Sequence, residues 1–273
     1  MELKEKIRNS IRAYIMADAL GVPYEFKAKG TFNCNTFASG GFHNQPKGTW
    51  SDDSSVLLCL IDAFSNDYNR SQQFEIFKQN MKSWYHNQKF NAGTGLFDIG
   101  TQTRTALIQG GSEESESMGN GALFYALPIA IICSATEYSE FGTQRLFELF
   151  CAFTHNNRNC FKFGGAFCLL IRKLLLDLPI ESIEVTKYEN RGDVINTYNL
   201  VIDNFLANQN TGSFLLDDIC SVVNLGEDTD TNAALFAALM GTKKEVDEKD
   251  WKQVKRYDEI DSAIDTLINS VGL

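Results

Sequence analysis

Two short acidic segments hold the residues of this sequence that are best suited to chemistry. The first is WSDDS at residues 50–54, and the second is GEDTDTN at residues 226–232. An apolar run typical of a buried helix follows each segment, so the carboxylates should lie at a helix N-terminus. A single aspartate in that place can simply cap the helix and complement its dipole. For either segment taken alone, that structural role remains open.

Considered together, the two segments favour a shared metal centre. Each combines carboxylates with hydroxyl groups, and such hard oxygen donors are the ligands that Mg²⁺ and Mn²⁺ prefer. The adjacent charges of Asp52 and Asp53 repel each other, which makes them costly at the start of a buried helix without a cation. Asp228, Asp230 and Thr231 likewise supply more ligands than a cap needs. We therefore expect these segments, remote in the chain, to converge on the same cations.

Helices should position the two segments. The 273 residues include 44% hydrophobic residues and only 4 prolines, which favours one helical domain spanning residues 1–273. Apolar spacing predicts an all-α fold of about ten helices. The predicted helices cover residues 3–20, 53–66, 71–86, 97–107, 122–133, 141–155, 164–177, 190–208, 214–223, 229–241 and 258–271.

Four local predictions accompany this assignment. Asp98 should be exposed in the first turn of its helix, and Pro128 should kink its helix or delay its start. Residues 27–49 are rich in Gly, Asn, Ser and Thr, which is typical of an irregular loop. Residues 178–188 should form an insertion or a short strand pair.

Composition limits the environment and the partners. The formal net charge of −10 leaves no basic patch for nucleic acid. No apolar run reaches about 18 residues, and the N-terminus lacks the apolar core of a signal peptide, so we expect a cytoplasmic protein without a membrane anchor. The 7 cysteines form no CxxC pair and should be reduced thiols within the core. We expect a monomer.

Six motifs, in order along residues 13–241, resemble those of the ADP-ribosylglycohydrolase family. The family includes dinitrogenase-reductase-activating glycohydrolases and ADP-ribosyl-acceptor hydrolases. Each motif is weak by itself, whereas six in the same order are specific. The motifs are ADALGVPYE at 17–25, WSDDS at 50–54, FDIG with Thr103 at 97–103, GNGA at 119–122, THN at 154–156 and DTDTNAA at 228–234.

The resemblance implies an all-α fold with a binuclear Mg²⁺ centre, in which Mn²⁺ is also possible. Glu25 would act as general base or position the attacking water, together with Asp53 and Asp228 at the metals. By matching position, the metal ligands would be Ser51, Asp52, Asp53, Asp228, Asp230 and Thr231. The substrate-binding residues would be Asp98, Gly119, Asn120, Gly121 and His155, and the GNG loop would hold the pyrophosphate.

Each of these assignments has a structural alternative. Glu25 could cap a turn at the exit of the first helix, and Asp98 could be a helix N-cap. His155 could be an ordinary structural histidine. Two departures from the family pattern affect the site. Glu227 replaces a common glycine and adds bulk and charge near the metals, while Tyr125 replaces a common arginine and removes a phosphate or structural contact.

The function implied by the resemblance is hydrolysis of the glycosidic bond between ADP-ribose and a modified protein side chain. Arginine is the expected acceptor, and the substrate would be an ADP-ribosylated protein or a small ADP-ribose conjugate. Serine-linked ADP-ribose or a small ADP-ribose ester is an alternative substrate. The same residues are also compatible with a non-catalytic ADP-ribose-binding relative, or with a metal-free glycoside hydrolase that uses paired carboxylates.

Overall fold

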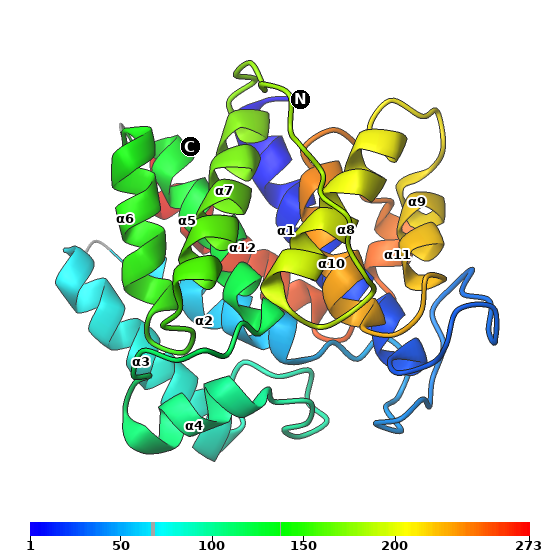
Figure 1. Cartoon of the computed structure of the whole chain (residues 1–273), viewed down its shortest axis with the longest axis horizontal. Helices are drawn as coiled ribbons and strands as arrows, with labels where there is room; N and C mark the ends of the chain where they lie inside the picture. The colour runs from blue at the N-terminus through cyan, green and yellow to red at the C-terminus, as the bar shows by residue number, and fades with distance from the viewer. Residues whose placement is uncertain (67–68, 137) are drawn as a thin grey trace.

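Helices make up the regular structure of this protein (Figure 1). The computed structural model describes residues 1–66, 69–136 and 138–273. Within those ranges the fold is all-α, as predicted, with two short 3₁₀ helices, η1 and η2. The elements are α1 (Leu3–Gly21), η1 (Val22–Tyr24), α2 (Asp52–Phe64), α3 (Arg70–Asn87), α4 (Thr101–Gln109), η2 (Asn120–Tyr125), α5 (Ala126–Ala135), α6 (Glu140–Cys151), α7 (Arg158–Leu175), α8 (Val194–Asn208), α9 (Leu215–Val223), α10 (Thr229–Met240), α11 (Glu248–Trp251) and α12 (Tyr257–Ser270).

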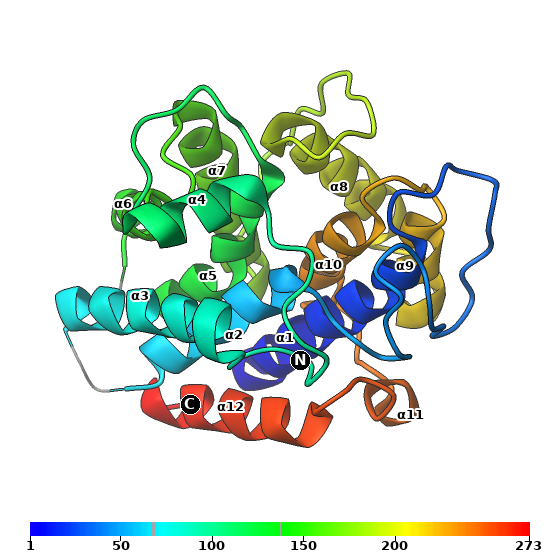
Figure 2. The same ribbon diagram turned by 90° about the horizontal axis from the view of Figure 1, so that it is seen from below.

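The centre of the molecule is the pair formed by α1 and α10, which lie side by side (Figures 1 and 2). Every residue of α10 is buried, which explains why residues 233–240 are apolar on all sides. The two helices approach each other closely at Gly21, where an added Cβ would lie 2.3 Å from the Cα of Asp230. A side chain at residue 21 would therefore separate the end of α1 from the start of α10.

The other helices surround this pair. α2 packs against α3 on one side and α12 on the other, while α5 and α6 both pack against α7. α8 and α9 also contact α10. Figure 2 shows α12 along one edge of the molecule, and Figure 1 shows α4 at another. No helix in the described residues is long and apolar enough to cross a membrane.

The start of α7 differs from the prediction. The side chain of Asn157 accepts hydrogen bonds from the backbone N–H groups of Asn159 and Cys160, so the helix begins at Arg158, six residues earlier than predicted. Gly164, the predicted first residue of this helix, lies inside α7. Its missing Cβ would be 2.2 Å from the Phe147 ring, so this glycine allows α6 and α7 to approach closely.

Four further predictions can be compared with the structure. Asp98 lies in a loop at φ 51°, and α4 begins only at Thr101, so its placement in the first helical turn was wrong. Pro128 falls in the first turn of α5, because the chain before Ala126 is 3₁₀, which confirms a delayed start. Residues 178–188 form neither helix nor strand, which excludes the predicted strand pair. All seven cysteines are free and buried, as predicted.

Candidate active site

A single cavity of about 280 Å³ collects residues from both acidic segments and from four other motifs. It opens beside the N-termini of α2 and α10. Ser51 and Asp230 stand directly behind its wall, and the other predicted site residues line it. Those lining residues are Glu25, Asp52, Asp53, Asp98, Gly119, Asn120, Gly121, His155, Asp228 and Thr231.

The first acidic segment is held by the N-terminal turn of α2 and by α1. Ser51 is the N-cap, and its hydroxyl contacts both the backbone N–H and the carboxylate of Asp53 at 3.3 Å. The carboxylate of Asp18, fully buried on α1, accepts the backbone N–H groups of Ser51 at 2.8 Å and Ser54 at 3.1 Å. Burial raises the pKa of Asp18 to about 6, although these hydrogen bonds act in the opposite direction and lower it. Asp18 thus fixes the start of α2 to α1.

The second acidic segment is held by different contacts. Asp228 precedes α10 and accepts a hydrogen bond from the Asn120 amide at 2.6 Å. Thr229 donates its hydroxyl to the carbonyl of Gly21 at 2.8 Å, which fixes the start of α10 to the end of α1. Thr231 donates to the carboxylate of Asp53 at 3.2 Å. This last bond joins the two acidic segments directly, across 178 residues of sequence.

The charge and hydrogen bonding of this cluster fit divalent cations. The cavity wall contains no Lys or Arg among the described residues. One carboxylate oxygen of Asp53 and one of Asp230 are buried without any hydrogen-bond partner. Burial, followed by repulsion between neighbouring carboxylates, raises the pKa of both groups well above its usual range. Orphaned buried oxygens of like charge are what a cation site needs, because Mg²⁺ and Mn²⁺ bind through such oxygens.

Glu25 is placed over this cluster by a strained backbone contact. The Phe26 N–H donates to the Glu227 carbonyl at 2.7 Å, and the Glu227 N–H donates to the Lys27 carbonyl at 2.9 Å. Phe26 and Glu227 both adopt φ 63°, a conformation that bulky residues rarely take and that costs about 1–3 kcal/mol. One carboxylate oxygen of Glu25 lies within 4.8 Å of oxygens from Asp228 and Asp230. Burial and then the charges of these two aspartates raise the pKa of Glu25 to about 11.

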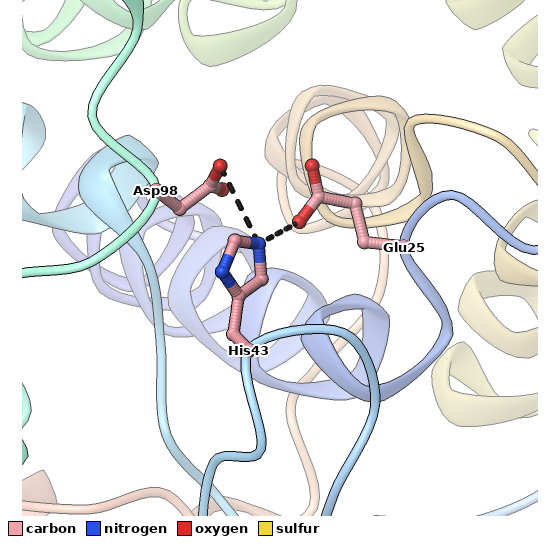
Figure 3. A group of neighbouring side chains, drawn as sticks. All are labelled: Glu25, His43 and Asp98. Carbon is pink, nitrogen blue, oxygen red and sulfur yellow. Dashed lines mark hydrogen bonds and ion pairs between the residues drawn. The ribbon is translucent and has the colours of Figure 1, made fainter.

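His43 connects Glu25 to Asp98 (Figure 3). Its Nε2 lies 2.7 Å from a carboxylate oxygen of Glu25 and 3.5 Å from one of Asp98. Burial lowers the pKa of His43, and its Nε2 shares a hydrogen bond with the Glu25 carboxyl group. Burial, followed by the charges of Asp52 and Glu25, raises the pKa of Asp98 to about 10. The imidazole therefore lies between the two acidic groups at this end of the cavity.

A profile of the ADP-ribosylglycohydrolase family matches residues 1–188 of the chain. The chain belongs to the ADP-ribosylglycohydrolase family. The ADP-ribosylarginine hydrolase Tri1 of Serratia proteamaculans (strain 568) is 27% identical over 267 residues, which cover 88% of this chain and 72% of that protein. The ADP-ribosylarginine hydrolase Tri1 of Pseudomonas putida (strain GB-1) is 26% identical over 135 residues, which cover 46% of this chain and 36% of that protein.

The fold of this ADP-ribosylglycohydrolase also has a solved counterpart. A structure described as an ADP-ribosylglycohydrolase-related protein complex matches with a TM-score of 0.75, covering 99% of both chains at 22% identity. At that identity the match supports the fold alone. Together with the family profile, it confirms the predicted family, the all-α fold and the assignment as a hydrolase. The second acidic segment lies beyond the matched residues of the profile, so its place in the site comes from the geometry described above.

Two backbone donors of the GNG loop of this ADP-ribosylglycohydrolase have partners within the protein. The Gly119 N–H already donates to the Gln102 side chain at 2.9 Å, and the Asn120 N–H donates to the Gly192 carbonyl at 3.4 Å. These two donors are therefore engaged within the protein. The contribution of Gly121 is steric, because an added Cβ would lie 3.0 Å from the His155 ring. Asn120 itself positions the carboxylate of Asp228.

His155 lies at the end of a buried hydrogen-bonded chain. Its Nδ1 contacts the Thr154 hydroxyl at 2.7 Å, and that hydroxyl contacts the Tyr125 hydroxyl at 2.5 Å. Burial lowers the pKa of His155 to about 4, so the ring is neutral at pH 7. Tyr125, the departure from the family arginine, thus orients the imidazole through Thr154. Glu227, the other departure, is exposed, so its side chain adds no bulk to the cavity wall and only its backbone helps to place Glu25.

Two residues of the site were not identified from the sequence. Asp18 falls within the ADALGVPYE motif, but no role was predicted for it, although an aspartate on the buried face of a helix is itself a signal. His43 lies in the polar loop 27–49, where only its rarity, as one of 3 histidines, could have drawn notice. Both residues act through contacts with distant segments, which local patterns do not reveal.

Proposed function

We propose that the protein removes ADP-ribose from modified arginine side chains, with Mg²⁺ or Mn²⁺ bound at the two acidic segments. The observation that carries the proposal is the meeting of Asp53, Asp228 and Asp230 beneath Glu25 at one cavity, which has no Lys or Arg among its described lining residues. The names of the two Tri1 relatives favour arginine as the acceptor. In this proposal the substrate is an ADP-ribosylated protein or a small conjugate, and a monomer is sufficient.

Each proposed ligand has a place in this scheme. Ser51, Asp52 and Asp53 would hold the cations from the start of α2. Asp228, Asp230 and Thr231 would hold them from the start of α10. Bound divalent cations would supply positive charge that orients the ribose hydroxyls and polarises a water molecule.

The remaining residues act on the substrate and on the water. Glu25 is a base only in its carboxylate form, which burial and the neighbouring aspartates disfavour. For Glu25 to function as a base, the negative charge of the neighbouring aspartates must therefore be neutralised. His43 holds the Glu25 carboxyl group through a 2.7 Å contact and so sets its direction over the anomeric carbon. Gly119, Gly121 and His155 bound the far end of the cavity, where the rest of ADP-ribose would lie.

The decisive experiment is hydrolysis of ADP-ribosylarginine followed by release of ADP-ribose, with Mg²⁺ and with EDTA. We expect turnover with Mg²⁺ and none in EDTA. Asp228→Asn should lower kcat at least about 100-fold, since loss of one preorganised charge contact commonly costs that much. Asp217→Asn, a matched change of an exposed aspartate on α9, should leave kcat unchanged.

The outcomes separate the competing functions. Full activity in EDTA would refute the metal role and point to paired carboxylates acting alone. Turnover of ADP-ribosylserine or of an ester, but not of the arginine conjugate, would change the acceptor. Tight ADP-ribose binding without turnover of any linkage would make the protein a non-catalytic relative.

A further inference from the structure

Two exposed phenylalanines stand beside the Glu25 end of the cavity. Phe26 is 57% exposed and Phe42 is 74% exposed, and their rings meet edge to face at 5.0 Å. Each ring also neighbours His43, with centroids 6.0 Å and 5.1 Å away. His43 contacts Glu25 and Asp98 (Figure 3), so the aromatic pair beside His43 adjoins the acidic end of the site.

The segment that presents Phe42 is a built turn. Gly40 and Gln45 exchange two backbone hydrogen bonds, at 2.7 Å and 3.1 Å, which close the turn around Phe42 and His43. Gly41 has φ 76°, and an added Cβ would lie 2.6 Å from the Pro23 carbonyl, so the turn packs directly against the end of η1. Figure 1 and Figure 2 both show loop 27–49 projecting from one edge of the helices.

This arrangement is costly, and burial does not offset the cost. A phenylalanine at φ 63° is strained, whereas glycine or asparagine would adopt that conformation more easily. Two large rings left in solvent contribute little hydrophobic stabilisation. Strain and exposed apolar surface are typical of residues that contact a ligand.

The position of the aromatic pair in the site indicates which part of the substrate it would contact. The GNG loop and His155 lie together, and an added Cβ on either glycine of that loop would approach the imidazole. Glu25 and Asp98 line the same cavity, and His43 forms a group with them. In the proposed function ADP-ribose extends toward His155 and the bond to be cleaved lies at Glu25, which places the acceptor side chain beside the aromatic pair.

The chemistry of this surface suits a guanidinium group. Aromatic faces attract cations, and arginine more often than lysine, because its planar group also stacks. Asp98 and Glu25, which both contact His43, place carboxyl oxygens that can accept guanidinium N–H groups beside the rings. We propose that Phe42 and Phe26 form the acceptor subsite, which binds the guanidinium group of the arginine that carries ADP-ribose. The proposal rests on the arginine-directed hydrolysis proposed above.

The test measures binding of a free guanidinium compound to the protein saturated with Mg²⁺ and ADP-ribose. Agmatine is the probe and putrescine, which has an amine in place of the guanidinium group, is the matched ligand, with affinities from titration calorimetry. Phe42→Ala should weaken agmatine binding about three- to tenfold and raise the KM for ADP-ribosylarginine by a similar factor. Phe42→Tyr should retain wild-type affinity, since its ring is kept.

The controls separate the subsite from general damage. Phe214→Ala removes a ring that is 82% exposed before α9, and it should change neither agmatine affinity nor KM. Affinity for ADP-ribose alone should stay within about twofold of wild type in Phe42→Ala, because ADP-ribose lacks the acceptor group. Equal agmatine affinity in wild type and Phe42→Ala would overturn the proposal, and so would wild-type protein that fails to prefer agmatine over putrescine.

The two proposals fail in different ways. Agmatine binding that depends on Phe42, without hydrolysis of ADP-ribosylarginine by wild type, would support the subsite and refute the proposed reaction. Hydrolysis by wild type with an unchanged KM in Phe42→Ala would refute the subsite and leave the reaction standing.

Discussion

The starts of α2 and α10 have similar acidic sequences, yet α1 holds them in different ways. The start of α2 is held by a charged side chain, the carboxylate of Asp18, which accepts two backbone N–H groups. The start of α10 is held by close backbone approach at Gly21 and by the Thr229 hydroxyl. One attachment is electrostatic and the other is steric. A single helix thereby sets the distance between two carboxylate groups that repel each other.

The largest effect should come from breaking the steric attachment. Gly21→Ala places a Cβ 2.3 Å from the Asp230 Cα, and the backbone there cannot yield without moving α10. We expect a loss of about 3 kcal/mol or more in the free energy of unfolding, together with loss of hydrolase activity. Urea denaturation and a turnover assay would measure both. Gly212→Ala, which meets no atom within 4 Å, is the control, and equal behaviour of the two variants would contradict close packing at Gly21.

The electrostatic attachment should be the next most sensitive. Asp18→Asn keeps the shape of the side chain but replaces one acceptor oxygen with a donor, which faces an N–H group of Ser51 or Ser54. We expect a loss of about 2 kcal/mol in stability and weaker Mg²⁺ binding, because Asp53 shifts with the helix start. Denaturation and metal titration would test this, with Asp217→Asn as the matched surface change. Unaltered Mg²⁺ affinity would show that Asp18 does not position the first acidic segment.

The buried acidic groups that surround the two helix starts should make the stability of the protein depend on pH. In the folded chain the pKa of Glu25 is raised to about 11 and that of Asp98 to about 10, while both groups ionise near pH 4 when unfolded. Between pH 7 and 9 the folded protein therefore holds more protons, so its free energy of unfolding falls as pH rises, by about 1 kcal/mol per pH unit for each group. His155, whose pKa is lowered to about 4, is neutral in the folded protein throughout this range.

Denaturation at pH 7, 8 and 9 in EDTA and in Mg²⁺ would measure this dependence. The slope should be steep in EDTA and shallow in Mg²⁺, because a cation favours the ionised carboxylates. Identical slopes under the two conditions would indicate that the carboxylates do not bind the added metal.

The smallest effect should come from the hydroxyl that joins α10 to α1. Thr229→Val keeps the side-chain shape and removes the bond to the Gly21 carbonyl, for an expected loss of about 1 kcal/mol. Thr266→Val is the control, since its hydroxyl bonds a carbonyl on the exposed face of α12. Thermal denaturation of the pair would compare them. A loss as large as that of Gly21→Ala would mean that the hydroxyl, rather than the close approach, holds α10.

The sequence by itself determined the helical fold and both acidic segments. Apolar spacing is a local property, so helices such as α1, α2 and α10 follow from it directly. The order of the motifs was sufficient to predict the family, which the comparison with the family profile confirms. Boundaries were less certain where a side chain decides them, as Asn157 does for α7.

Only the tertiary structure decided which residues meet. Thr231 reaches Asp53 across 178 residues, and His43 reaches both Glu25 and Asp98 from a loop without regular structure. No local pattern marks such contacts, because they depend on how helices pack and not on the period of one helix. Asp18 and Gly21 show the same limit, since each is an ordinary residue of α1 until a second helix is placed against it.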